Sequence, residues 1–435
     1  MGKSSHLCTA KIKVMEMKRS LIVLCLFLFL GTYAIAQRNK MLLPEMRTLT
    51  VLAGADGNSL PILQLGLAER LHISFDIMDT EYRRFTYRIE HLTWDFHPTT
   101  EIFESDYVRA AAEEEVIEDY EESMNTTTSY AHYWLEFPNE RMRPLLAGNY
   151  RLSITTEDED GESVPAAEVY FAVIDPQAAL SVNFTTNTDV DWNQAHQQLS
   201  MELDMRNLTL RDERAEVKTI ILQNRRWDNA VVDPTPTYRN GQKLIWNHCR
   251  DLIFPAGNEF RAFDMLSTRY PGMHMESIRW EDDTYQAVVE PDEPRRNYLV
   301  YNDRNGQYVS RTNDSAEAAT ESDYCRTRFT YVTPPLPDAD VYLNGQWTNN
   351  RFTPEYKMEY DESLGAYVAD LHLKLGYYSY QYLAVPHAGK RCGLSGPLDG
   401  DFWQTENEYT VLVYYRRTGD RYWSLVAETN PSYKP

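Results

Sequence analysis

Residue types that commonly perform catalysis are present in this 435-residue sequence, but not at the spacings that catalysis needs. The sequence contains no Walker loop, no GxGxxG turn and no HExxH helix. Gly393-Leu394-Ser395-Gly396 has a glycine directly after the serine, whereas a nucleophile elbow has the pattern Gly-x-Ser-x-Gly. This segment is therefore expected to be a turn. Acidic residues are so numerous that a pair able to flank a glycosidic bond can be chosen anywhere, and without geometry such a choice carries no information.

The metal-binding patterns are incomplete as well. Asp158, Asp160 and Gly161 match part of a calcium-binding loop. Its first and twelfth ligand positions would be Thr156 and Ala167, although the twelfth requires a bidentate glutamate. We therefore predict a hairpin tip here. For the whole chain we expect no catalytic residue, no metal and no cofactor, so that the protein is not an enzyme.

Aromatic side chains are the most distinctive chemical groups of the chain, which has 30 tyrosines. Tyr378, Tyr380 and Tyr382 occupy alternate positions, so in a strand they share one face. We predict that this face belongs to a core or to an interface. The alternative is a platform for stacking sugars, to which Trp347 and Trp403 would contribute.

Some residues are of the types that anchor protein–protein interfaces. The candidate anchors for a partner are Arg225, Arg226, Trp227, Trp347 and Trp403. For the first three, a solvated turn is the alternative. The segments 341–347 and 376–382 also resemble starch- and glycogen-binding β-sandwich modules. This resemblance implies an alternative function, an exported glycan-binding protein that uses the aromatic face of a C-terminal sandwich.

The N-terminal residues have the pattern of a secretory signal peptide, which we place at residues 1–36. Lys18 and Arg19 precede ten apolar residues, 21–30, and a small-x-small site follows, so cleavage is expected between Ala36 and Gln37. A spanning helix would need about 20 apolar residues, so we expect no direct membrane insertion. Three cysteines remain after cleavage, and we expect buried thiols or at most one disulfide among Cys249, Cys325 and Cys392.

The charge of the chain excludes some partners. The formal net charge is −22, and removal of residues 1–36 makes it −26, because this segment contains five basic residues and one acidic residue. A net anion is repelled by nucleic acid and by anionic lipid surfaces, so we expect no nucleic-acid partner.

Apolar and polar residues alternate along most of the chain, which is typical of half-buried strands. The predicted strands are 71–78, 150–155, 168–175, 199–205, 218–224, 283–290, 297–301, 329–333, 341–347, 409–415 and 422–426, together with two strands within 371–383, one on each side of Gly376. No long segment has a helical apolar face. We therefore predict an all-β protein with few helices, built of tandem immunoglobulin-like or E-set-like β-sandwich domains.

The expected domains are an N-terminal sandwich, 37–175, a middle sandwich, 176–330, and a C-terminal sandwich, 331–435, which resembles glycan-binding or E-set modules. The acidic segment 110–122 is expected to be a short helix or a mobile insertion between strands. The polar segment 312–323 is expected to be a mobile excursion at the surface.

Taken as a whole, the chain resembles the plug proteins of the type IX secretion system. The segments that carry the resemblance are 146–152, 207–210, 219–228, 252–264, 298–308, 341–347, 400–415 and 419–422. The resemblance implies a non-enzymatic protein of the periplasm, at the inner side of the outer membrane. Its partner would be the outer-membrane translocon barrel, whose periplasmic opening it would plug to prevent leakage when no substrate is engaged.

Overall fold

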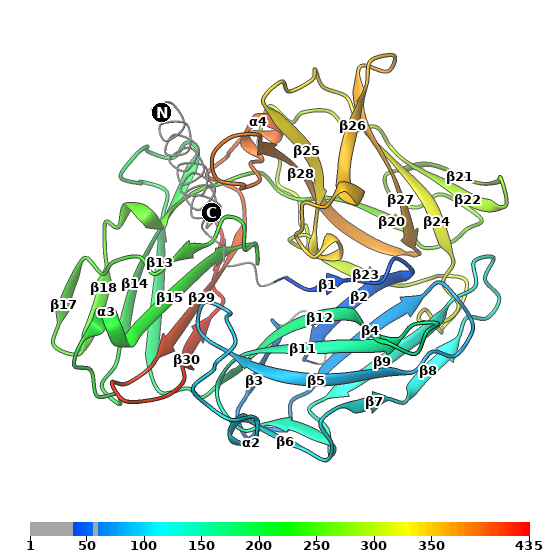
Figure 1. Ribbon diagram of the computed structural model, residues 1–435. Helices are drawn as coiled ribbons and strands as arrows, with labels where there is room; N and C mark the ends of the chain where they lie inside the picture. Colours follow the sequence, from blue (N-terminus) through cyan, green and yellow to red (C-terminus); the bar gives the residue numbers. More distant parts are fainter. Residues whose placement is uncertain (1–37, 55–59) are drawn as a thin grey trace, which may run out of the picture. The chain divides into compact units, whose positions relative to one another are not determined.

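The computed structural model describes residues 38–54 and 60–435, and its regular elements are almost all strands (Figure 1). The prediction of an all-β sandwich architecture is confirmed. The described residues contain three α-helices of four residues each and three short 3-10 helices: α2 (Glu104–Tyr107), α3 (Glu213–Glu216), α4 (Gly396–Asp399), η1 (Arg250–Leu252), η2 (Gln346–Thr348) and η3 (Pro354–Tyr356). None of these helices is long and apolar enough to cross a membrane. The predicted signal peptide and its cleavage site lie outside the described residues.

The first core lies between two sheets whose strands are mainly antiparallel. Its strands are β1 (Lys40–Met41), β2 (Met46–Ala53), β3 (Ile62–Gln64), β4 (Leu71–Ile77), β5 (Phe85–Leu92), β6 (Val108–Ala110), β7 (Glu115–Ile117), β8 (Asp119–Glu122), β9 (Ala131–Phe137), β10 (Met142–Pro144), β11 (Gly148–Glu157) and β12 (Ser163–Ile174). One sheet has the order β2-β4-β9-β8, and the facing strands have the order β12-β11-β5-β7. Alternate residues such as Ile73, Phe75 and Leu152 are fully buried between them, as period-2 patterning requires.

Two local predictions in this region have different outcomes. The segment around Asp158 is the predicted hairpin tip between β11 and β12, where the Asp158 carboxylate accepts hydrogen bonds from the amides of Asp160 and Glu162. The prediction for 110–122 is wrong, because this segment contains the strands β7 and β8. Ile117 is 1% exposed in the first core and Glu115 is buried beside it, so burial of alternate residues outweighs the acidic composition.

The second core combines the middle of the chain with its end. Its strands are β13 (Ala179–Thr185), β14 (His196–Asp204), β15 (Val217–Gln223), β16 (Val231–Val232), β17 (Tyr238–Asn240), β18 (Lys243–Trp246), β19 (Ile253–Pro255), β29 (Asn407–Tyr415), β30 (Ser424–Thr429) and β31 (Ser432–Tyr433). One sheet has the order β13-β14-β18-β17, and β16-β15-β29-β30 faces it. In Figure 1 the red strands of the chain's end lie beside the green β15, which pairs with β29 over seven residues.

The third core is formed by the chain between these two parts. Its strands are β20 (Arg261–Met265), β21 (Met275–Glu281), β22 (Thr284–Val289), β23 (Tyr308–Ser310), β24 (Tyr324–Tyr331), β25 (Ala339–Asn344), β26 (Lys357–Asp361), β27 (Ala366–Lys374) and β28 (Gly376–Pro386), in the order β20-β28-β25-β26-β27-β24-β22-β21. Strands from both sides of the expected limit at residue 330 therefore share one sheet. The three expected domain ranges stay a prediction.

One predicted strand of this region, 297–301, is irregular. Leu299 and Val300 are 71% and 82% exposed, so their side chains have no facing sheet. The Tyr298 hydroxyl donates instead to the Glu259 carboxylate, at 2.8 Å. Alternation without a neighbouring strand is not sufficient to form a ladder.

A continuous sheet joins the first and second cores. β12 ends in parallel pairing with β30, where Ile174 lies opposite Leu425, so strands of both cores belong to one 11-stranded sheet. The Asp175 amide donates to the Leu425 carbonyl at 3.0 Å. The Tyr414 hydroxyl of the second core donates to the Asn149 side chain of the first, at 2.9 Å. The two cores therefore share backbone hydrogen bonds as well as side-chain contacts.

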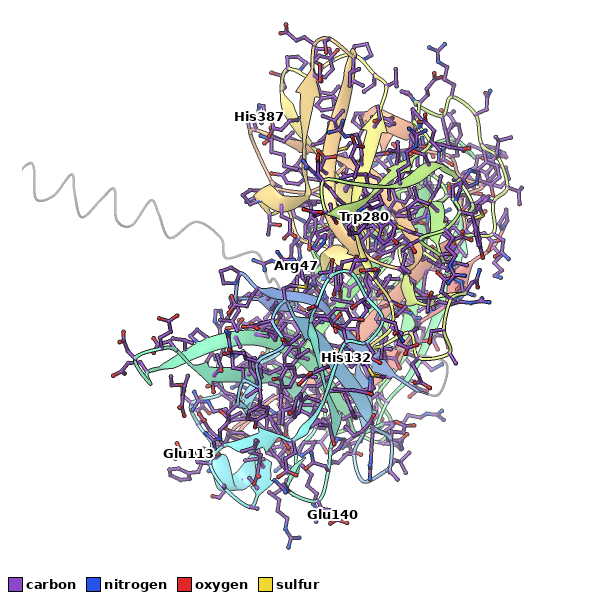
Figure 2. All side chains as sticks on the ribbon, turned by 90° about the vertical axis from the view of Figure 1, so that its right-hand side faces the viewer. Arg47, Glu113, His132, Glu140, Trp280 and His387 are labelled. Carbon is purple, nitrogen blue, oxygen red and sulfur yellow. The ribbon has the colours of Figure 1, made fainter. Side chains whose placement is uncertain are left out.

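Buried charges join the first and third cores. Lys374 at the end of β27 donates to Asp76 of β4 at 2.6 Å, and the side chains are 2% and 1% exposed. The Tyr324 hydroxyl also donates to Asp76. The ring of His132 on β9 lies 2.6 Å from the Asp76 carboxylate, and His132 is labelled in Figure 2. Burial opposes ionisation of Asp76, but the charge of Lys374 holds its pKa below the usual value.

The segment 312–323 packs against the same joint, so the prediction of a mobile excursion is contradicted by its contacts. The Tyr130 hydroxyl donates to the carbonyls of Ala319 and Ser322. The Asp323 carboxylate accepts hydrogen bonds from the Thr127 amide and hydroxyl, and it is 7% exposed. The polar composition of this segment indicated a solvated loop, but these polar groups form hydrogen bonds with residues of the first core.

Lys374→Met tests whether the buried ion pair holds the two cores together. The variant leaves Asp76 buried without its main counter-charge, so we expect the free energy of unfolding at pH 7 to fall by about 3–5 kcal/mol. Urea unfolding followed by tryptophan fluorescence measures this loss. Lys243→Met is the matched control, since the side chains of the Lys243–Glu202 ion pair are about 40% exposed, and its free energy of unfolding should stay close to that of the wild type. Equal losses in the two variants would contradict this role of the pair.

Candidate partner-binding surface

Arg226, one of the five candidate anchors, is buried. Asn224 and Arg225 follow β15 with positive φ angles of 52° and 57°, and this turn directs Arg226 inward. Its guanidinium donates to the Asp228 carboxylate at 2.6 Å and to the Gly393 carbonyl at 2.6 Å, and the residue is 6% exposed. The alternative of a solvated turn is therefore wrong for Arg226. The structure gives this residue an internal role.

Asp228 connects Arg226 to the beginning of the described chain. The Arg38 guanidinium lies 3.4 Å from its carboxylate, and the Gly393 amide donates to it at 2.9 Å. Burial opposes ionisation, but the charge and hydrogen bonds of Arg226 and the charge of Arg38 hold the pKa of Asp228 below its usual value. This cluster thus joins the N-terminal segment, the turn after β15 and the loop after β28.

Arg225, Trp227 and Trp347 lie around one cavity of about 190 Å³. Arg225 forms an ion pair with Glu408 at 3.2 Å, and the Trp227 ring packs edge-on against Phe96. The cavity is also lined by residues of β2, β3, β12, β15 and β29, so it lies where strands of the first and second cores meet η2 of the third. Three of the five candidates are therefore close together, although Trp347 is more than a hundred residues from the other two in the sequence.

Trp347 belongs to the third core as much as to the cavity. Its indole N–H donates to the Ser379 carbonyl at 3.0 Å, and its ring packs edge-on against Tyr356 and Tyr378. The residue is only partly exposed. An interface there would use one edge of the indole while the other side stays in the core.

Trp403 lies apart from this group. Its amide donates to the Gln194 carbonyl in the loop between β13 and β14, and its carbonyl accepts from the Gln197 side chain. The loop 186–195 carries Trp192, which is 70% exposed and was missed in the sequence. The residues around Trp192 show no apolar alternation. A tryptophan among polar residues was therefore the only sign in the sequence that this position is exposed. The role of the five candidates at a partner interface stays a prediction.

The face of Tyr378, Tyr380 and Tyr382 lies inside the third core. These residues are 2%, 1% and 1% exposed, which confirms the core interpretation of this strand. The hydroxyls of Tyr380 and Tyr382 both donate to the Asp292 carboxylate, at 2.6 and 2.8 Å. A sugar-stacking platform must be open to solvent, so these rings do not provide one. The third core covers this side of β28, as the main prediction from the sequence requires, and the alternative of a sugar platform on these three tyrosines is wrong.

A buried acid, Glu259, and a partly exposed acid, Asp303, lie beside the loop that carries Trp403. Glu259 is 1% exposed; one carboxylate oxygen accepts from Tyr298 and from the Glu406 amide, and the other has no partner. Burial, and then the negative charges of Asp303 and Glu406, raise the pKa of Glu259 to about 7. Burial also raises the pKa of Asp303 to about 6. Both carboxyls therefore change charge close to neutral pH.

The three described cysteines are free thiols. Cys325 is buried in the third core, and Cys249 and Cys392 are partly exposed. Within the described residues no three His, Cys, Asp or Glu side chains are placed to hold a metal ion.

Comparison with known proteins identifies the family. Residues 46–174, which are the strands β2 to β12 of the first core, match the family model described as type 9 secretion system plug protein 1st domain. The chain belongs to the type IX secretion system plug protein family. This confirms the resemblance found in the sequence, and it associates the chain with that secretion system in a plug role.

Most of this plug-family chain aligns with a solved structure. A crystal structure of a hypothetical protein from Parabacteroides merdae ATCC 43184 is 33% identical, with a TM-score of 0.87, and the alignment covers 91% of this chain and 99% of that one. The collagen adhesin CNA from S. aureus aligns over 92% of this chain and 93% of its own, but at 7% identity and a TM-score of 0.12, which supports no inference. No curated protein matches the chain.

Glu259→Gln tests the buried acid. A carboxyl whose pKa is raised in the folded state makes the fold less stable as the pH rises from the ordinary value of 4.5 through about 7. We expect the wild-type chain to lose on the order of 2 kcal/mol of unfolding free energy from this group between pH 5 and pH 8, and the variant to lose less. Urea unfolding at both pH values measures the difference. An unchanged pH dependence would contradict the assignment, and Glu362→Gln, at an exposed turn, is the control.

Proposed function

We propose that the protein is a non-enzymatic component of the periplasm that occupies the periplasmic opening of the type IX outer-membrane translocon barrel. It prevents leakage through the barrel when no substrate is engaged. The observation that carries the proposal is membership in the plug protein family, through the match of the first core. The partner is the barrel itself, and the site of action is the inner side of the outer membrane.

The connections between the cores support this role physically. A plug must resist deformation across the width of an opening. Each pair of cores is joined by a different device: a continuous sheet, the ion pair of Asp76 with Lys374, and the cluster of Arg226 and Asp228 with Gly393. Buried polar joints fix the relative position of the cores because a small displacement would leave a buried charge or hydrogen-bonding group without its partner before water could reach it.

The surface charge supports a soluble body held by a protein partner. The net charge of −22 is repelled by anionic lipid, so attachment to the membrane surface is unfavourable. In this proposal the protein reaches the outer membrane only through the barrel. The expected signal peptide supplies export to the periplasm.

Deletion of the gene in its native host tests the proposal. In the deletion strain we expect uptake of an antibiotic too large for the intact outer membrane to rise, because nothing closes the opening. Growth inhibition by that antibiotic measures the leak. A chromosomal copy of the wild-type gene should restore resistance, and Lys243→Met should restore it equally.

Affinity purification of the tagged chain from native envelopes supplies the second measurement. We expect the large outer-membrane barrel to be recovered with it in stoichiometric amount. Unchanged permeability after deletion, together with recovery of no barrel, would contradict a plug.

A further inference from the structure

Strand β13 is an unprotected edge of the second core. It is the first strand in the order β13-β14-β18-β17, and its seven residues pair with β14 without interruption. The chain has no charged residue between Asp175 and Asp189, although a quarter of the whole sequence is charged. β13 also contains no proline and no bulge. An edge strand of this kind presents a row of backbone N–H and C=O groups to any extended chain that approaches it.

The other edges of the described sheets are protected. β8 has three acidic residues in four, and β21 carries Glu276, Arg279 and Glu281 and a bulge. β2 is interrupted by a bulge after Arg47, and β20 contains two charged residues in five. The edge strands β7, β16 and β17 are two or three residues long. Among the described edge strands, only β13 is long, free of bulges and free of charged residues.

The apolar face of β13 is incompletely covered. Leu180, Val182 and Phe184 point to the second core but stay partly exposed, whereas their partners on β14 are 0–2% exposed: Leu203, Met201 and Leu199. One more strand, with an apolar residue at every second position, would bury Leu180, Val182 and Phe184. The opposite face of β13 carries Ala179, Ser181, Asn183 and Thr185, all exposed and uncharged.

We propose that β13 is a docking edge, to which an extended segment of the secretion machinery adds as a further strand. The added segment is apolar at every second position and has no acidic residues, since the chain it approaches has a net charge of −22. The same charge disfavours a second copy of this chain as the occupant. This inference rests on the proposed function, because it takes the partner from the same secretion system.

The loop that follows β13 extends the edge with an aromatic anchor. Trp192 lies in this loop with 70% of its surface exposed, and Asn187 and Trp192 form an isolated bridge that holds the loop closed. The candidate anchor Trp403 contacts the same loop through Gln194. Backbone pairing along β13 supplies affinity, and an exposed indole at its end supplies a side-chain contact.

Hydrogen exchange on the purified complex tests the docking edge. The amides of 180–185 that point away from β14 should exchange roughly tenfold or more slowly in the complex with the barrel than in the free chain. Asn183→Lys should reduce recovery of the barrel, because a charge on the edge opposes strand pairing, and its thermal midpoint should equal that of the wild type since the side chain is exposed. Asn240→Lys, the same change on the opposite edge β17, is the matched control and should leave recovery unchanged.

The outcomes separate this inference from the proposed function. If the wild-type chain recovers no barrel, the proposed function fails and the docking edge fails with it. If the barrel is recovered while 180–185 stay unprotected and Asn183→Lys binds as well as Asn240→Lys, the docking edge alone is overturned. Protection of 180–185 in the free chain, with a dimer by light scattering, would also overturn it and assign the edge to a second copy.

Discussion

The buried ion pair of Lys374 and Asp76 is the constraint on which the arrangement of the cores depends. Removing two charges from water is unfavourable by several kcal/mol per ion, and only close and complete pairing offsets this. Here the ammonium group donates to Asp76 and to the Ala319 carbonyl and lies over the Tyr130 ring, while Asp76 also accepts from Tyr324. These groups come from both cores, so the first and third cores stay in one relative position or leave buried charges unpaired.

The other two joints also fix the relative positions of the cores, but by different means. The ladder of β12 with β30 gives the first and second cores a common sheet, and the guanidinium of Arg226 connects the second core to Gly393 beyond β28. Because each core is connected to both of the others, a force on one core is passed to the other two, and the cores do not separate at a single hinge. This property is suited to closing an opening, and it explains how a chain of many short strands can act as one object.

The sequence reveals local patterns of burial, but it does not reveal which distant segments contact each other. Alternation located β4, β11, β14 and β15, because it depends only on which face of a strand is buried. The pairing of β15 with β29 was not predictable, since nothing in either strand specifies a partner almost two hundred residues away. Burial of Arg226 was missed for the same reason: its partner Gly393 is distant in sequence, so the local composition resembled a surface turn. The incomplete cover of β13 likewise became visible only when its neighbours were known.

The most direct measurement of the plug role is the conductance of the purified translocon barrel in a planar lipid bilayer. Addition of the mature chain to the periplasmic side should close the open barrel in discrete steps, at concentrations where binding is saturated. Addition to the other side should leave the conductance unchanged. A conductance that stays the same while the bound chain is detected on the periplasmic side would contradict the account.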